Sequence, residues 1–176
     1  MQPWKKKKPL MRQPKFQTVF DPMEREVLGN LTSTVAEAII QRAQSAPKDE
    51  LAEMTDMPSG HTEAPEDPSL KRLFPDFQRP EDEEFDGDAS LLRSLHENDI
   101  AKAKLQNFQI INEALGPTGG VEVSISEQEA RAFVAALNDL RLYVAASEDR
   151  NEMDREAIVD WLAYNQESLL EAMMGE

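Results

Sequence analysis

The residues whose spacing comes nearest to a known chemical site are the acidic ones around position 82. Asp82, Glu84 and Asp86 stand at the first, third and fifth positions of a calcium-binding loop, and Gly87 stands at its sixth. Such a loop is completed by a bidentate carboxylate at its twelfth position, which in this sequence is Arg93. The ligand set is incomplete, so we interpret this segment as a solvated acidic loop.

Other residue types that carry chemistry do not form a recognisable set. The two histidines, His61 and His96, have no second histidine at a ligand spacing, and the chain has no cysteine. Gly116, Gly119 and Gly120 lie between a predicted helix and a predicted strand, which is the wrong order for a phosphate-binding loop. We therefore expect no enzyme, cofactor or bound metal. A metal hydrolase that uses helix carboxylates is kept as an alternative, although the 34 acidic residues offer no distinctive pair.

Positive charge is concentrated at the start of the chain. The formal net charge is −15, yet the first sixteen residues hold six lysines and arginines and no acid, so the remainder carries −21. An acidic body repels nucleic acid and anionic membranes over most of its surface. Residues 1–14 have no apolar periodicity and are predicted to be a disordered basic arm. Nucleic-acid binding by Lys5, Lys6, Lys7 and Lys8 is an alternative function, in which an indole such as Trp4 stacks on a base.

Polar residues set among leucines near position 140 are the more informative candidates. Apolar residues at 137, 140, 142 and 144 cover more than one face of a helix, which places Asp139 and Arg141 near packed surface. Half-buried charges need partners, so we expect Arg141 to pair with Asp160 or Glu167. An exposed partner-binding patch is the alternative interpretation. The candidate cluster consists of Asn138, Asp139, Arg141, Asp160, Trp161, Gln166 and Glu167.

Amphipathic helices must position these residues. Asp21 followed by Pro22 starts one helix, which Pro47 limits to about residue 45, and Ser126 with Glu129 forms a capping box for another. Further helices are predicted over 88–115, either as one helix or divided by a break near Asn98, and over 154–174. Alternating residues at 15–20 and 121–125 predict two short strands. The predicted fold is mainly α, a four- to five-helix bundle with a small two-stranded β ribbon.

One domain is predicted for residues 15–176. The chain has 176 residues, of which 40% are apolar, and this suffices for one core. An acidic connector rich in proline is predicted at 47–87, with Leu70, Leu73, Phe74 and Phe77 docked on the body. No apolar run approaches the roughly twenty residues of a membrane span, and the basic start lacks an apolar leader segment. We expect a cytoplasmic protein.

Several short motifs resemble those of an actinobacterial protein family of unknown function. They are NDLRL at 138–142, DWL at 160–162, QESL at 166–169, LFP at 73–75 and FDP at 20–22. The resemblance covers residues 15–174 and implies a nearly all-helical protein. Genes of the family often lie beside a Clp protease adaptor and a metallopeptidase linked to cysteine synthesis. Some members are described as oxidative stress regulators that act through a sigma factor and a cysteine pair. This chain has no cysteine and so lacks that sensor.

The hypothesis that follows is a non-enzymatic cytoplasmic regulatory or adaptor protein that acts through protein–protein contacts. The resemblance implies a sigma factor or a protease-adaptor system as partner. Self-association is a further hypothesis, because Met23, Leu170, Met173 and Met174 are predicted to leave an apolar strip that a homodimer would cover.

Overall fold

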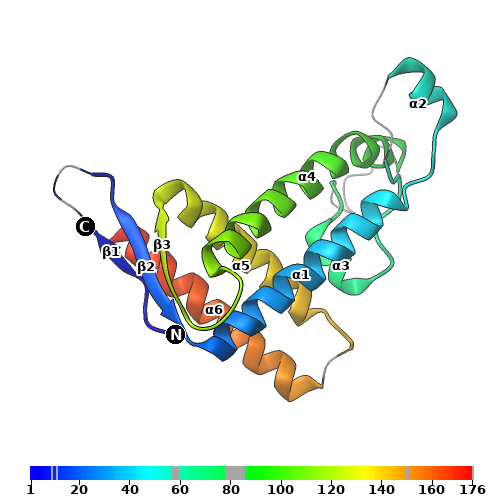
Figure 1. Cartoon of the computed structure of the whole chain (residues 1–176). Coiled ribbons are helices and arrows are strands. Elements are labelled where there is room, and N and C mark those ends of the chain that lie inside the picture. Colours follow the sequence, from blue (N-terminus) through cyan, green and yellow to red (C-terminus); the bar gives the residue numbers. More distant parts are fainter. Residues whose placement is uncertain (9, 11, 57–59, 78–85, 150, 176) are drawn as a thin grey trace.

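The computed structural model describes residues 1–8, 10, 12–56, 60–77, 86–149 and 151–175. Helices dominate this part of the chain, which confirms the prediction of a mainly α fold (Figure 1). The elements in order are β1 (Lys5–Lys7), β2 (Lys15–Phe20), α1 (Pro22–Gln44), α2 (Glu50–Thr55), α3 (Pro68–Leu73), α4 (Asp86–Leu115), β3 (Val121–Ser126), α5 (Glu127–Ala145) and α6 (Glu152–Met174).

A small antiparallel sheet lies at one end of the molecule. The predicted ribbon is confirmed, because β2 pairs with β3 from Lys15 opposite Ser126 to Phe20 opposite Val121. The sheet has a third strand that the sequence did not predict: β1 pairs with the other edge of β2, giving the order β1-β2-β3. Alternation along β2 buries Phe16, Thr18 and Phe20 toward the helices.

The prediction of a disordered arm is wrong for the residues around β1. Trp4 is only 4% exposed, its ring packs edge-on against Phe20 and Phe133, and its indole N–H donates to Asn165 Oδ1 at 2.7 Å. Its backbone N–H donates to Ser168 Oγ at 2.9 Å. Burial of one large aromatic side chain with its polar atoms satisfied stabilises the segment. The prediction of disorder failed because it rested on the lysine content of the segment and did not account for the burial of Trp4.

Capping boxes begin α1 and α5 as predicted. The Asp21 side chain accepts the Glu24 N–H while the Glu24 side chain accepts the Asp21 N–H, both at 2.9 Å. Ser126 and Glu129 exchange the same pair of bonds, and the hydrogen bond from the Ser126 backbone lowers the pKa of Glu129. Each strand therefore passes directly into a capped helix.

Helix α4 is continuous over 30 residues, so of the two alternatives the undivided helix is the one observed. No proline or glycine interrupts the helix between Ser90 and Leu115, and Asn98 lies within regular turns. The helix ends at Gly116, whose φ of +65° is a left-handed conformation that favours glycine. The turn into β3 uses Gly119 in the same way, at φ +81°.

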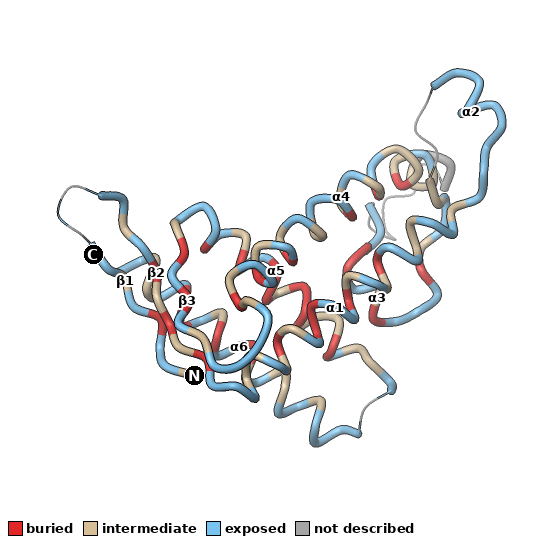
Figure 2. The backbone as a smooth tube through the Cα atoms, viewed as in Figure 1, coloured by how far each residue is buried: buried red, intermediate tan, exposed pale blue. Residues whose placement is uncertain are grey.

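The core lies where α1, α4, α5 and α6 meet the inner face of the sheet (Figure 2). Helix α5 is central, because it packs against α3, α4 and α6 as well as the sheet. Buried side chains recur along it at Phe133, Leu137, Leu140 and Val144, at spacings of three and four. None of the helices in the described ranges is long and apolar enough to cross a membrane.

Two short helices occupy the predicted connector. Helix α2 stands away from the bundle and is mostly exposed (Figures 1 and 2). Helix α3 packs against α5, and the adjoining Leu73 and Phe74 are 2% and 3% exposed, which confirms their predicted docking. Phe77 is 37% exposed, so its docking is only partial.

Candidate functional site

Asp139 of the predicted polar cluster joins two helices of the core. Its carboxylate accepts a hydrogen bond from Lys104 Nζ of α4 at 2.7 Å, and the residue is only 6% exposed. Burial raises the pKa of the Asp139 carboxyl group, although the Lys104 hydrogen bond and charge act to lower it. Asp139 therefore has a satisfied structural position between α4 and α5.

Arg141 does not form the expected bridge to α6. Its Nη2 donates to Asn138 Oδ1 at 3.4 Å, one turn earlier on the same helix. Within the described residues it pairs with neither Asp160 nor Glu167, both of which are exposed on α6. Among the described residues, the polar contacts of Asp139 and Arg141 go to Lys104 and Asn138 and not to α6, and the role of the seven residues in partner binding stays a prediction.

Trp161 and Gln166 lie half-buried on α6. The Trp161 ring meets Phe20 edge-on with centroids 6.4 Å apart, which ties α6 to the sheet. Trp161 Nε1 and Gln166 Oε1 are buried and find no hydrogen-bond partner among the described residues. Trp161 therefore contributes a packing contact between α6 and the sheet.

A buried ionic cluster that the sequence did not predict lies between α1, α4 and the connector. Glu97 Oε1 accepts from Arg42 Nη2 at 2.9 Å and from Arg93 Nη1 at 3.0 Å. Arg93 and Glu97 are each 3% exposed. Arg93 also pairs with the exposed carboxylate of Asp76 at 3.1 Å and donates to the backbone oxygen of Phe74 at 3.2 Å. The charges of this cluster are thus mutually satisfied.

The same cluster holds the connector on the body. Arg42 Nη2 donates to the Glu63 backbone oxygen at 2.8 Å, and His61 Nε2 lies 2.7 Å from the Arg42 backbone oxygen. Gly60 passes so close to α4 that an added Cβ would lie 2.8 Å from the Ser94 backbone oxygen. The connector is therefore attached to the helices here by polar contacts and by a close approach that only glycine allows.

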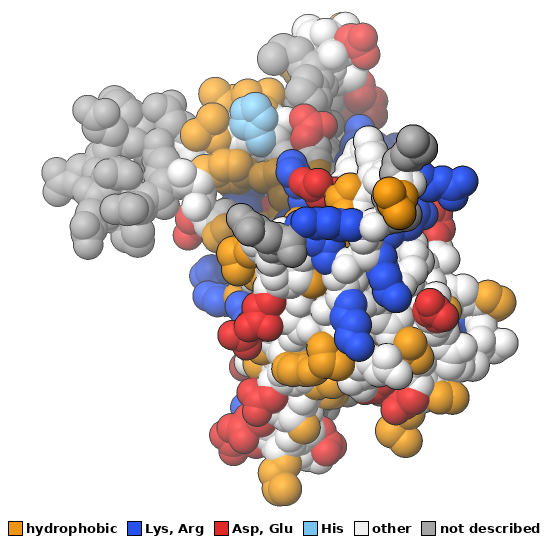
Figure 3. Space-filling view, turned by 90° about the vertical axis from the view of Figure 1, so that its left-hand side faces the viewer, with side chains coloured by type: hydrophobic (Ala, Val, Ile, Leu, Met, Phe, Trp, Pro, Cys, Tyr) orange, Lys and Arg blue, Asp and Glu red, His pale blue; other side chains and the backbone are white. Residues whose placement is uncertain are grey.

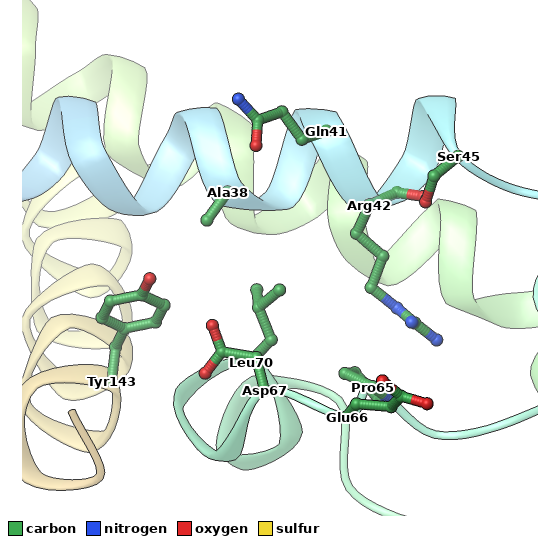
Figure 4. A pocket seen from close by; sticks show the side chains of 9 residues that line it. All are labelled: Ala38, Gln41, Arg42, Ser45, Pro65, Glu66, Asp67, Leu70 and Tyr143. Carbon is green, nitrogen blue, oxygen red and sulfur yellow. The ribbon is translucent and has the colours of Figure 1, made fainter. Parts of the chain in front are cut away.

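A hollow of about 490 Å³ opens beside this cluster (Figure 4). Figure 4 shows Tyr143 of α5 at one side and Arg42 of α1 at the other, with Leu70 and Asp67 of the connector between them. Burial raises the pKa of Tyr143, and the carboxylates of Asp67 and Asp149 raise it further. Arg42 is already bound to Glu97 and to the Glu63 backbone oxygen, so the guanidinium that lines the hollow is not free. Ser45, also in the lining, donates its hydroxyl to the Arg42 backbone oxygen at 2.8 Å and lies 3.3 Å from His61 Nε2.

The acidic loop lies mainly outside the described residues, including Asp82 and Glu84. Arg93, which occupies the twelfth position of that pattern, belongs to the buried ionic cluster. In the part of the chain that the structure describes, no three His, Asp or Glu side chains gather in a way that could hold a metal ion.

The lysine run is divided by the alternation of β1. Lys5, Lys7 and Lys8 are exposed, whereas Lys6 is half-buried and its Nζ donates to the Gly175 backbone oxygen at 2.6 Å. The four lysines therefore do not act as one flexible arm. Three of them are available to solvent from a fixed position.

Comparisons with known proteins found similarity over most of this chain. A family model described as a domain of unknown function (DUF2017) matches residues 1–173. A Mycobacterium tuberculosis protein and a Mycobacterium bovis protein, both named oxidative stress regulator AosR, are each 34% identical to this chain over 183 residues. The alignments cover 92% of this chain and 84% of each relative. No solved structure matches.

Proposed function

This chain belongs to the DUF2017 family, and from that premise we propose that it is a regulatory protein of the oxidative stress response that works in the cytoplasm by binding a protein partner. The observation that carries the proposal is the 34% identity, over 92% of the chain, to relatives that are named oxidative stress regulators. Similarity over 92% of the chain indicates the same fold, and it extends well beyond one shared motif.

The geometry of the polar residues supports binding over catalysis. Asp139 is paired with Lys104, and Glu97 is paired with two arginines, so these buried charges are used to join elements. The hollow of Figure 4 contains a tyrosine whose pKa is raised, which keeps the hydroxyl protonated. A protein that regulates without chemistry of its own must act through contacts with another molecule.

Absence of cysteine shapes the proposal. No thiol of this chain can be oxidised, because the sequence contains none. The oxidant signal therefore reaches this protein by a route other than a cysteine thiol of its own, such as its partner or a change in its own abundance. This distinguishes the proposal from a thiol switch within the chain.

Deletion of the gene in the source organism tests the regulatory role. Cells are exposed to a sublethal dose of hydrogen peroxide, and transcripts are compared between the parental strain, the deletion strain and the deletion strain complemented with the wild-type gene. We expect the peroxide-dependent transcript changes to be altered on deletion and restored on complementation. Identical responses in the parental and deletion strains would reject the proposal.

Cross-linking in cells tests the binding part separately. Tagged wild-type protein is compared with an Arg141→Ala variant and with an Arg131→Ala variant, whose side chain lies exposed on the same helix. We expect a partner that cross-links to wild type and to Arg131→Ala, with loss for Arg141→Ala if the predicted polar cluster forms the contact. Recovery of no protein above an untagged control would contradict action through a stable partner.

A further inference from the structure

The outer face of the sheet carries three lysines at neighbouring positions. In the register of the strands, Lys5 lies opposite Gln17 and Lys7 lies opposite Lys15. Lys5, Lys7 and Lys15 are all exposed, and they project from the side of the sheet opposite to the buried Phe16 and Phe20. Figure 3 shows Lys and Arg side chains gathered at this end of the molecule. We call Lys5, Lys7 and Lys15 the lysine face.

The lysine face is held rigidly by the contacts of β1. Trp4, next to Lys5, is inserted into the core and bonded to two residues of α6. The amino group of Met1 pairs with Glu24, and Gln2 N–H donates to the Val19 backbone oxygen at 3.1 Å. The backbone positions that carry these lysines are therefore fixed before any partner binds, which lowers the part of the entropic cost of binding that comes from ordering the backbone.

Protection of a sheet edge does not account for this arrangement. Lysines on an edge strand commonly prevent pairing with another sheet, and β1 is an edge strand. Lys15, however, lies in the central strand, where it has no such role. Its position directly opposite Lys7 is destabilising, because like charges face each other across the strands. Glu129 lies near enough to Lys15 for the charges to interact, yet no ion pair within the described residues neutralises the three lysines.

Charge and shape indicate what this face binds. A hollow of about 250 Å³ is lined by Lys5, Lys7, Gln17 and Val19, with Glu122 on the far strand. We propose that an acidic segment of a protein partner lies across the lysine face, with carboxylates on Lys5, Lys7 and Lys15. The inference rests on the proposed function and names the surface through which the partner is held. Opposite charges would replace the unfavourable Lys7–Lys15 pair.

Nucleic acid fits this face less well than an acidic protein segment does. The outer positions of the three strands hold no arginine and no aromatic ring on which a base could stack. Glu122 lies on the same face, and the rest of the chain carries a net charge of −21 that would repel a long polyanion. A short acidic segment can contact Lys5, Lys7 and Lys15 while extending over less of the acidic surface than a long polyanion does.

Fluorescence anisotropy of a labelled peptide of glutamates tests the proposal on the full chain. Wild type is compared with Lys5→Glu/Lys7→Glu/Lys15→Glu and with Lys48→Glu/Lys71→Glu/Lys102→Glu, which changes the net charge equally at three other exposed lysines. We expect wild type and the control triple to bind at low salt, the lysine-face triple to bind at least about tenfold more weakly, and affinity to fall toward roughly 0.15 M salt. Equal binding by the two triples, or no binding by wild type, overturns the proposal.

Two further arms keep the outcome interpretable. Lys5→Gln/Lys7→Gln/Lys15→Gln removes the charges without reversing them. This variant replaces the first triple in the binding assay if circular dichroism shows that the first triple does not fold. A labelled single-stranded DNA of similar charge is titrated in parallel, and tighter binding of DNA than of the peptide, lost in the same variant, overturns the acidic-protein proposal in favour of nucleic acid. Failure in these assays leaves the peroxide response of the deletion strain unaffected, so it is distinguishable from failure of the proposed function.

Discussion

Two buried carboxylates form ion pairs between neighbouring helices of this bundle. Asp139 links α5 to α4 through Lys104, and Glu97 links α4 to α1 through Arg42. Moving charged groups out of water is costly, and the cost is offset only while each charge keeps its partner. Substitutions at these residues therefore have effects that depend on which partner remains.

Asp139→Asn should change how stability varies with pH. Because burial raises the pKa of Asp139 in the folded state, the folded chain binds more protons than the unfolded chain between the usual pKa of an aspartate and the raised value. The free energy of unfolding of wild type therefore falls, relative to Asp139→Asn, as pH rises through this interval. Urea denaturation at a series of pH values measures the difference, with the exposed Asp160→Asn as control. A relative stability that instead grows with rising pH would contradict this reading.

Glu97→Gln should be strongly destabilising. The substitution leaves Arg42 without its carboxylate partner and Arg93 with only the exposed carboxylate of Asp76, and removing one partner of a buried ion pair costs about 3–5 kcal/mol. Glu127→Gln is the matched control, because its pair with Arg131 is exposed and contributes about 0–1 kcal/mol. Chemical denaturation of both variants gives the comparison. Equal effects would show that the buried cluster contributes no more than a surface pair.

Elements differ in how far the sequence could predict them. The starts of α1 and α5 were predictable because Asp21 with Glu24 and Ser126 with Glu129 are local signals three residues apart. Strand β1 was not, because its anchor Trp4 bonds to Asn165 and Ser168, more than 160 residues away. Local composition reported only lysines and prolines there. The contacts of the polar clusters could not be predicted for the same reason, because they also join residues that are far apart in the sequence.

The buried ionic cluster could be predicted from the sequence only in part. Arg93 and Glu97 are four residues apart on one helix, a spacing at which a pair can be predicted. Arg42 lies 55 residues before Glu97, and no pattern in the sequence joins them. The expected pairing of Arg141 with Asp160 or Glu167 failed for the converse reason: helix spacing placed these residues on neighbouring helices but did not determine the rotation of α6.

Trp4→Ala should release β1 from the body. The substitution removes the ring contacts with Phe20 and Phe133 and the bond to Asn165, and truncating a buried tryptophan costs about 3–5 kcal/mol. Leu10→Ala, at a side chain that is 99% exposed, should change stability by less than about 0.5 kcal/mol. Urea denaturation and limited proteolysis near Lys5–Lys8 measure both effects. If Trp4→Ala matched the control, the segment would not be part of the core.

At the scale of the whole molecule, a small sheet and a helical bundle share an aromatic core. Phe20 of β2 meets Trp161 of α6 and Trp4 of β1, so the sheet and the helices share their aromatic core. Exposed methionines such as Met23 and Met174 lie outside this core, at 75% and 77% exposure. Their predicted role in a homodimer stays a hypothesis that light scattering can test.

Unfolding should be a single transition. Both tryptophans lie at the sheet end, so their fluorescence reports the sheet, whereas far-ultraviolet circular dichroism reports the helices. Because the two regions share buried residues, we expect the two signals to change at the same urea concentration. Separate midpoints would show that the sheet and the bundle unfold independently, contrary to the predicted single domain.

We propose that this protein regulates the response to oxidants through a partner held on its lysine face. The most direct measurement is the peroxide-dependent transcript response of the deletion strain after complementation with wild type, with Lys5→Glu/Lys7→Glu/Lys15→Glu, or with Lys48→Glu/Lys71→Glu/Lys102→Glu. The account predicts restoration by wild type and by the control triple, and no restoration by the lysine-face triple at equal protein abundance. Full restoration by the lysine-face triple would contradict it.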